Sequence, residues 1–246
     1  MLDIHSHILP NIDDGSKSEE ETLKLLRKAI SEGITGIIAT PHFDPTYHTT
    51  RTQIEEKVKI ANKIAQDNNL EITVYPGQEV RLYAELVENL EDHVTLLNNG
   101  IYMLVELPED HVPMYAEKVF YELQLKGVQP ILVHPERNQG ILRNPNILYD
   151  FVNRGVLAQI TAGSVIGKFG KQTKKLSLEL LDHELIHFIA SDAHHLGSRD
   201  FHMAKAKKVI SRKFGKDFAE NLYNNADLIA TNSTIYSGYP EPFKTK

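Results

Sequence analysis

Short apolar runs alternate with longer amphipathic stretches along the whole chain. The apolar runs are rich in Ile, Val and Leu with little polar alternation, which is typical of strands covered on both faces. We interpret them as seven strands, at residues 2–5, 36–40, 71–75, 102–106, 130–134, 157–161 and 187–191. Strands that alternate with helices are usually parallel and joined by right-handed crossovers. The pattern therefore predicts an α/β fold, built as either an open doubly wound sheet or a closed barrel.

The stretches between the strands have the periodicity of amphipathic helices. The first has Ser18 and Glu21 at capping-box spacing. Apolar stripes are predicted at Leu23, Leu26 and Ile30 in this helix, at Ile54, Val58, Ala61 and Ile64 in the second, and at Tyr115, Val119 and Leu123 in the third. The predicted helices cover residues 18–33, 52–66, 113–127, 146–154, 172–182, 201–212 and 216–223.

The chain shows no sign of division into separate domains. Its 246 residues contain no low-complexity linker and no fixed-period repeat, and one α/β barrel of this length is common. We therefore predict a single domain over residues 1–246, with a surface tail at 233–246. No apolar run approaches the roughly 18 residues of a membrane span, and the N-terminus lacks a leader pattern. These features predict a cytoplasmic protein without membrane insertion.

Composition excludes several kinds of chemistry. The chain contains no cysteine, so disulfides, thiolate metal sites and cysteine nucleophiles are ruled out. Its formal net charge of -6 argues against nucleic acid as a partner, because that binding needs a basic face.

Imidazole and carboxylate side chains follow six of the seven predicted strands. Since the carboxyl ends of parallel strands meet at one mouth, we expect these groups to converge there. Each alone could be a turn or capping residue, but six coincidences at one edge favour a single site. The strand-end groups are His5, His7, His42, Glu79, Glu106, His134, Asp192 and His194, and His195 follows directly after His194. Five of the twelve histidines are counted in this set, and the other seven, His195 among them, are predicted to be mostly at the surface.

This set of donors predicts a metal centre. His5 and His7 share one face of their strand because side chains alternate with period two. Imidazole and carboxylate without sulfur suit Zn, Fe or Mn. The donors exceed the about four ligands of one tetrahedral ion, so we expect two or three ions bridged by a carboxylate. Paired ions clamp the attacking and leaving oxygens of an in-line displacement.

Two arginines lie on loops that follow ligand-bearing strands. Arg137 is in HPERN and Arg199 is in HHLGSR. The guanidinium group of an arginine can donate two parallel hydrogen bonds to two oxygens of one phosphate. These two arginines therefore predict a phosphate-binding site. A surface salt bridge is an equally good interpretation of Arg199, and Arg81 is a weaker candidate.

Several segments together resemble a known family. The motifs DIHSHILPNIDDG, TPHF, GQEV, VELP, VHPERN and SDAHH resemble the polymerase-and-histidinol-phosphatase (PHP) superfamily. More closely, they resemble the manganese-dependent protein-tyrosine phosphatases of bacterial capsule and exopolysaccharide operons. The resemblance implies a distorted (β/α)7 TIM-like barrel, a trinuclear site for Mn2+, with Fe or Zn as alternatives, and the tail of a bacterial tyrosine kinase as substrate.

The resemblance also implies roles for individual residues. Arg137 and Arg199 match phosphate-binding arginines of the family. The first ion is assigned to His5, His7, Glu79 and Asp192, the second to Glu79, Glu106 and His134, and the third to Asp14, His42 and His194. We hypothesise direct attack on phosphorus by a hydroxide bridging two ions, without a phosphoenzyme. Asp192 or His194 is the candidate that assists the leaving phenolate.

Three alternatives stay open. The first is a histidinol-phosphate or other small phosphomonoester phosphatase of the same superfamily, although the short loops favour a protein substrate. The second is an amidohydrolase-type C–N hydrolase, which often uses a modified lysine at a strand end, and no predicted strand here ends in Lys. The third is a metal-bound regulatory subunit without catalysis, against which the complete ligand set argues.

Overall fold

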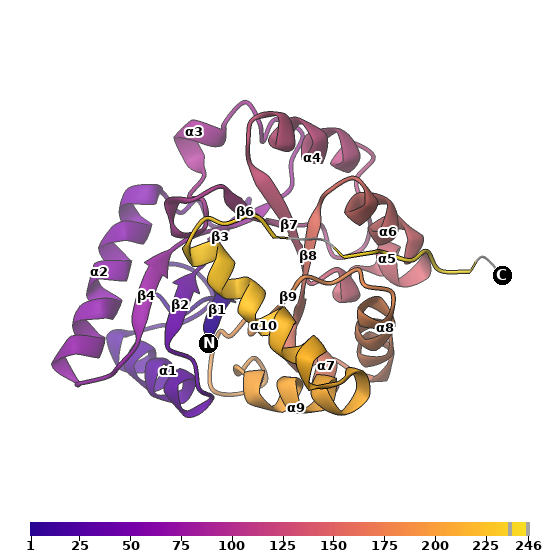
Figure 1. Ribbon diagram of the computed structural model, residues 1–246. Coiled ribbons are helices and arrows are strands. Elements are labelled where there is room, and N and C mark those ends of the chain that lie inside the picture. Colours follow the sequence, from indigo (N-terminus) through magenta and orange to yellow (C-terminus); the bar gives the residue numbers. More distant parts are fainter. Residues whose placement is uncertain (236–237, 245–246) are drawn as a thin grey trace.

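The computed structural model describes residues 1–235 and 238–244. Its strands form two parallel sheets surrounded by helices (Figure 1), which confirms the predicted α/β fold with parallel strands. One sheet has the order β1 (Leu2–Ser6), β2 (Gly36–Ala39) and β4 (Thr73–Pro76). The other has the order β3 (His42–Phe43), β5 (Glu79–Arg81), β6 (Tyr102–Glu106), β7 (Gln129–Val133), β8 (Leu157–Thr161) and β9 (Phe188–Ala190).

The carboxyl ends of β1 and β9 connect the two sheets. Ser6 and Ala193 form an isolated parallel bridge. The backbone N–H of Asp192 donates to the His5 carbonyl at 2.8 Å, and that of His7 donates to the Ala193 carbonyl at 2.8 Å. Within the described ranges no continuous ladder closes the strands into a barrel, so the observed arrangement is two parallel sheets joined at this seam.

The second and third predicted strands each continue beyond a short break. Pro41 separates β2 from β3, and Gly77 lies between β4 and β5. The register pairs His42 with Glu79 across β3 and β5. These two short strands were not predicted, because two or three residues carry no readable periodicity. They place His42 and Glu79 in the same sheet as the later strands.

The predicted helices are present with shifted ends. They are α1 (Glu19–Ser31), α2 (Arg51–Asp67), α4 (Ala116–Leu125), α6 (Asn146–Asn153), α8 (Lys171–Asp182), α9 (Met203–Phe214) and α10 (Lys216–Ala230). The last helix continues two turns past residue 223. Short elements that the sequence did not predict are α3 (Leu90–His93), η1 (Leu97–Asn99), η2 (Pro135–Arg137), α5 (Gln139–Arg143) and α7 (Ala162–Ile166).

The start of α1 differs in detail from the predicted capping box. The Ser18 hydroxyl accepts the Glu21 backbone N–H at 3.1 Å, as predicted. The Glu21 carboxylate instead accepts the backbone N–H of Lys17 at 2.6 Å. The predicted stripe is also displaced, because Leu23 and Ile30 are only half-buried while Leu25 and Ala29 are buried. Tyr115, predicted to face the core, is 37% exposed because it precedes α4 as its N-cap.

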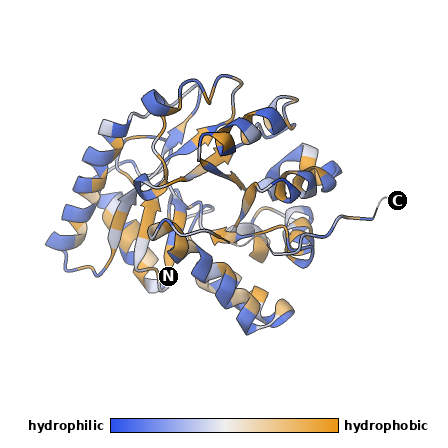
Figure 2. Ribbon diagram, turned by 45° about the horizontal axis from the view of Figure 1, so that its top comes forward, coloured by the Kyte–Doolittle hydropathy of each residue, from blue (hydrophilic) through white to orange (hydrophobic). Residues whose placement is uncertain are grey.

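Alternate residues of the central strands pack into two different cores. Tyr102 and Leu104 of β6 join an inner cluster that strands of both sheets share, whereas Met103 and Val105 pack outward against helices. α10 contributes Ala226 and Ile229 to the inner cluster and crosses in front of the strands near the N-terminus (Figure 1). Apolar strands inside mostly polar helices are visible in Figure 2. Apolar side chains therefore fill the space between the strands toward their amino ends. The polar groups lie at the carboxyl ends.

The predicted surface tail is partly docked. The Phe243 ring stacks on His183 with centroids 3.8 Å apart, and its backbone N–H donates to Asn146 Oδ1 at 2.7 Å. Residues 236–237 and 245–246 of this tail lie outside the described residues. Among the helices that the structure describes, none combines the length and apolarity needed to cross a membrane.

Candidate metal centre

The strand-end side chains converge on one cluster at the carboxyl edge of the sheets. Glu79 lies at its centre and is almost fully buried. Its Oε2 is 3.3 Å from His5 Nε2, 3.2 Å from His7 Nε2 and 3.1 Å from His42 Nδ1. Its Oε1 is 2.8 Å from His134 Nε2. Four imidazoles from three segments of the chain thus surround a single carboxylate.

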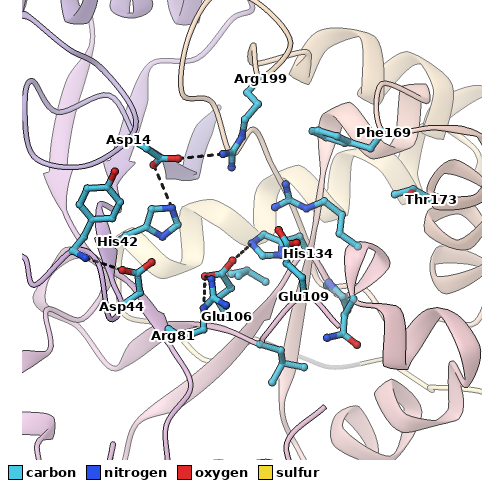
Figure 3. Close-up of a pocket in the computed structure, with 16 residues that line it drawn as sticks. Asp14, His42, Asp44, Arg81, Glu106, Glu109, His134, Phe169, Thr173 and Arg199 are labelled. Atoms are coloured by element: carbon cyan, nitrogen blue, oxygen red, sulfur yellow. Dashed lines mark hydrogen bonds and ion pairs between the residues drawn. The ribbon is translucent and has the colours of Figure 1, made fainter. Parts of the chain in front are cut away.

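A second carboxylate extends this cluster toward the loop after β9. Asp192 Oδ1 lies 3.5 Å from both His5 Nε2 and His7 Nε2. Asp14 Oδ1 lies 3.4 Å from His42 Nε2 and 3.3 Å from His194 Nε2. Figure 3 shows Asp14 and His42 on the side of the cavity opposite His134.

The ligand atoms fall into overlapping groups, each within 4.8 Å. His5, His7, His42 and Glu79 each belong to two of these groups. Such sharing is expected where one side chain lies between two neighbouring ions. They are His7, Asp14, His42 and His194; His5, Glu79 and His134; His5, His7 and Asp192; and His42, Glu79 and Glu106. Within the described ranges these groups contain all the predicted ligands and no other residue, whereas His195 is exposed and lies outside them. Which residues hold which ion stays a prediction.

The arrangement of the donors fits a cluster of divalent cations. The Nε2 atoms of His5 and His7 face one another at 3.3 Å, an arrangement that a cation between them would stabilise. Glu79 Oε2, His42 Nδ1 and His194 Nε2 are buried and make no hydrogen bond of acceptable geometry, although ionisable neighbours lie 3.1–3.3 Å from them. Buried polar atoms without partners are costly unless they coordinate a metal. The residues present therefore suit ions that prefer nitrogen and oxygen ligands.

Burial and the neighbouring charges shift the pKa values of the cluster residues in opposite directions. Burial and the nearby Glu79 raise the pKa of Glu106 to about 8. Burial and the nearby Arg137 lower the pKa of His134 to about 3. Burial opposes protonation of His7, but Asp13 and Glu79 outweigh it and raise its pKa to about 10. Cations would supply the positive charge that these crowded carboxylates lack.

Two buried residues that the sequence analysis did not assign to the site orient the imidazoles. Gln159 Oε1, on β8, lies 2.8 Å from His5 Nδ1. Asp13 Oδ2 lies 2.7 Å from His7 Nδ1. Each contact engages Nδ1 and leaves Nε2 directed at the cluster, as in carboxylate–histidine–metal arrangements. Gln159 was visible as a polar residue in the middle of a mostly apolar strand, and Asp13 as the first aspartate of the DDG turn.

The DDG turn holds Asp13 beneath His7. The backbone N–H of Gly15 donates to Asp13 Oδ1 at 2.9 Å. A Cβ at position 15 would lie 1.9 Å from the carbonyl oxygen of His7, so only glycine fits this close approach.

Replacing Asp13 with asparagine is expected to weaken Mn2+ binding about 10- to 100-fold, because the amide keeps the size but loses the charge that orients His7. Calorimetric titration of chelator-treated protein measures this. Asp110→Asn is the matched control, since Asp110 Oδ1 lies 2.7 Å from His111 Nδ1 in an exposed pair. Equal affinities of the Asp13 variant and wild type would contradict the assignment.

Both predicted arginines reach the cluster through Asp192. Arg137 Nη2 donates to Asp192 Oδ2 at 2.6 Å, and Arg199 Nη2 lies 3.0 Å from both Asp192 oxygens. The guanidinium of Arg137 also sits over the Phe169 ring, 5.3 Å from its centroid. The Nε atoms of both arginines are buried without a partner. Each fork thus keeps unused donors beside the cluster.

The cluster opens into a cavity of about 560 Å³. Figure 3 shows Asp44 and Arg81 on one wall of it and Phe169 and Thr173 on the other. Tyr47 and Asn138 also line it, and the sequence analysis named none of these except Arg81. A cavity of this size accommodates a small ligand or one side chain of a larger partner.

Two cluster residues have unusual backbone conformations. His134 has φ 35° and Asp192 has φ 52°, in the left-handed region that side chains disfavour by about 1 kcal/mol or more. The backbone N–H of His134 donates to the Gln159 carbonyl at 2.8 Å. Strain of this kind gathers at functional sites, where surrounding bonds hold it in place.

Four of the seven remaining histidines are exposed, as predicted for most of them, but His187 and His202 are buried. His187 is 3% exposed, and its Nδ1 accepts the Ala158 backbone N–H at 3.0 Å. His202 is 6% exposed at the start of α9. Both side chains are buried by the tertiary packing around them, which the neighbouring residues in the sequence do not reveal.

These observations define the class of protein: an α/β fold whose parallel strands carry a buried set of imidazoles and carboxylates beside two arginines. Residues 1–230 match the family model described as capsular polysaccharide synthesis, CpsB/CapC. The chain therefore belongs to the CpsB/CapC family, and the family predicted from the motifs is confirmed.

Curated relatives align over nearly their whole length. Tyrosine-protein phosphatase YwqE of Bacillus subtilis (strain 168) is 44% identical over 248 residues, which cover 100% of this chain and 98% of YwqE. The putative tyrosine-protein phosphatase CapC of Staphylococcus aureus is 39% identical over 252 residues, which cover 100% of this chain and 98% of CapC.

Solved structures agree with this placement. A crystal structure from work on YwqE of Bacillus subtilis and CpsB of Streptococcus pneumoniae, described as unique metal-dependent tyrosine phosphatases, matches with a TM-score of 0.97. The two chains are 43% identical, and each is covered completely. A phosphotriesterase homology protein from Escherichia coli matches with a TM-score of 0.57 at 12% identity, over 93% of this chain and 98% of that one. This second likeness extends to the fold alone.

Proposed function

We propose that this chain is a metal-dependent protein-tyrosine phosphatase. Its substrate would be phosphotyrosine on a bacterial tyrosine kinase that regulates capsule or exopolysaccharide synthesis. The observation that carries the proposal is the buried cluster of imidazoles and carboxylates directly beside two arginine forks in one cavity. The names of YwqE and CapC support the activity. The absence of cysteine excludes the thiolate route to the same reaction.

The proposed ligands are the residues of the cluster. They are His5, His7, Asp14, His42, Glu79, Glu106, His134, Asp192 and His194. We propose Mn2+ as the metal, in two or three positions, with Fe or Zn as the alternatives to test. Bound ions of this kind supply a water nucleophile of lowered pKa and neutralise phosphate charge.

The arginines act on the phosphate group in this proposal. Arg137 and Arg199 both pair with Asp192 and have unused N–H groups beside the cavity. Their forks would bind the non-bridging oxygens and stabilise the charge that develops on them. Asp192 would hold both guanidinium groups in position. Because burial and His7 lower the pKa of His194 to about 4, its ring is neutral at pH 7 and it is a poor proton donor to the phenolate.

We also infer that the two parallel sheets are parts of one distorted (β/α)7 barrel and that residues 1–246 form a single catalytic domain. The inference is supported by the bridge between Ser6 and Ala193 and by the inner core common to both sheets. β2 with β3, and β4 with β5, would each count as one broken strand of such a barrel.

The test is a substrate and metal panel. Phosphotyrosine peptide, phosphoserine peptide and histidinol phosphate are each assayed with Mn2+, Zn2+ and Mg2+, and with a chelator. We expect hydrolysis of phosphotyrosine peptide with Mn2+, and its loss with chelator. Hydrolysis of histidinol phosphate alone would show the small-molecule phosphatase instead. Metal binding without turnover of any substrate would show the regulatory subunit.

Acidification is expected to release the metal. The pKa of about 10 for His7 means that its ring binds a proton at neutral pH in the metal-free chain. A cation must displace that proton, so its apparent affinity falls about tenfold for each unit of pH decrease and each proton displaced. Titrations of Mn2+ at pH 8, 7 and 6 measure this slope. An affinity that does not change over this range would show that no proton is displaced.

A further inference from the structure

A second pocket adjoins the metal-site cavity. We call it the side pocket, and its volume is about 480 Å³. Asp44 and Arg81 line both it and the metal-site cavity, so the two spaces share a wall. The residues that line the side pocket are Phe43, Asp44, Pro45, His48, Arg81, Leu82 and Tyr83.

The walls of the side pocket are largely apolar and aromatic. The Phe43 ring lies 6.5 Å from Tyr83 and meets His48 edge-on at 5.8 Å. Leu82 also lines the side pocket and is only 2% exposed, because it packs in the hydrophobic core. Pro45 is exposed at the rim. A space of this kind favours apolar or aromatic groups, which gain free energy by leaving water.

The two charged residues of the shared wall are already paired. Asp44 Oδ1 accepts the backbone N–H groups of Thr46 and Tyr47, both at 2.7 Å. Arg81 Nε donates to Glu106 Oε2 at 2.9 Å, and Figure 3 shows this pair at the edge of the cluster. Neither charge therefore needs a polar group from an occupant, and the side pocket does not select a charged one.

We propose that the side pocket binds an apolar or aromatic side chain that flanks the phosphotyrosine in the same peptide. This inference rests on the proposed function. Consecutive Cα atoms are about 3.8 Å apart, so a residue one or two positions from the phosphotyrosine can fill a pocket that shares a wall with the reacting site. The side pocket thereby sets sequence preference without taking part in the chemistry.

Synthetic phosphotyrosine peptides test the proposal. Leucine is placed at each of the two positions before and the two positions after phosphotyrosine in an otherwise glycine-rich peptide. At one position the wild type is expected to show a kcat/KM about tenfold above that of the all-glycine peptide, mainly through KM. Tyr83→Ala should reduce this preference to about twofold, and Tyr83→Phe should retain it.

Two controls accompany these variants. Tyr121→Ala removes a tyrosine that is 62% exposed on α4 and lines neither space, so it should keep the preference. Hydrolysis of p-nitrophenyl phosphate should be unchanged in every variant, because that substrate has no flanking residue.

Three results would count against the inference. Equal kcat/KM for leucine and glycine at all four positions would overturn it. If Tyr83→Ala slowed p-nitrophenyl phosphate as much as the peptides, the side pocket would hold the phosphotyrosine ring, and the inference would also be wrong. Hydrolysis of no aryl phosphate at all would overturn the proposed function and the inference together, which distinguishes the two failures.

Discussion

Replacing His5 and His7 together with alanine is expected to lower turnover of p-nitrophenyl phosphate by about 10³-fold or more and to remove bound metal. The two Nε2 atoms lie 3.3 Å apart and within 3.3 Å of Glu79 Oε2, so both rings are needed to balance this carboxylate and to bind a cation beside it. Elemental analysis of the purified variant, together with the rate measured at saturating Mn2+, gives both quantities.

The matched control replaces two histidines that lie outside the cluster. His111 and His195 are exposed, and the double variant His111→Ala/His195→Ala should keep both rate and metal. His5 and His7 are buried, so their replacement could also unfold the protein. Thermal melts of both double variants show whether each is folded, so that loss of metal is not confused with unfolding. A folded His5→Ala/His7→Ala variant with full activity would end the proposed metal mechanism.

The clustering of these groups could be expected from the sequence because parallel strands deliver their carboxyl ends to one edge. His134 and Glu106 follow strands whose apolar runs are easy to read. His42 and Glu79 lie on strands of two and three residues that no pattern predicts. They still reach the cluster, since each directly continues a predicted strand after a single break. The ordering of secondary structure was therefore enough to bring the groups together.

The partners that orient the imidazoles could not be deduced in the same way. Gln159 and His5 are 154 residues apart, and only the pairing of β8 with β9, whose carboxyl end meets that of β1, makes them neighbours. The sequence shows a polar residue in an apolar strand but not the ring that it contacts. Asp13 is close to His7 in sequence, yet DDG is also a common turn pattern.

The direction of the β1 side chains is a further feature that period-two reasoning could not supply. His5 and His7 share a face, as the alternation predicts. Leu2 and Ile4 would then point away from the interior, but both lie in the inner core. The register of β1 against β2 shifts between Asp3 and Ser6, which changes the face that the later residues present. One local irregularity thus allows the same strand to supply apolar core and metal donors.

Arg137→Ala is expected to keep the metal content of the wild type while lowering kcat/KM for a phosphotyrosine peptide about 10²- to 10³-fold. Arg199 contacts both oxygens of Asp192, so that carboxylate keeps a positive partner when Arg137 is removed. The metal donors are therefore preserved, and the change removes one fork that would bind the phosphate. Steady-state kinetics with metal analysis on the same preparation measures the two effects separately.

Arg143→Ala is the control for this variant, because Arg143 is exposed at the end of α5 and its Nη2 donates to the Asp110 carbonyl at 3.1 Å, away from the cluster. It should leave the rate unchanged. Arg137→Lys keeps the charge but loses the planar fork, and it should recover only part of the lost rate. If Arg137→Ala instead lost metal in proportion to activity, its contact with Asp192 would be structural, and the phosphate role would pass to Arg199 alone.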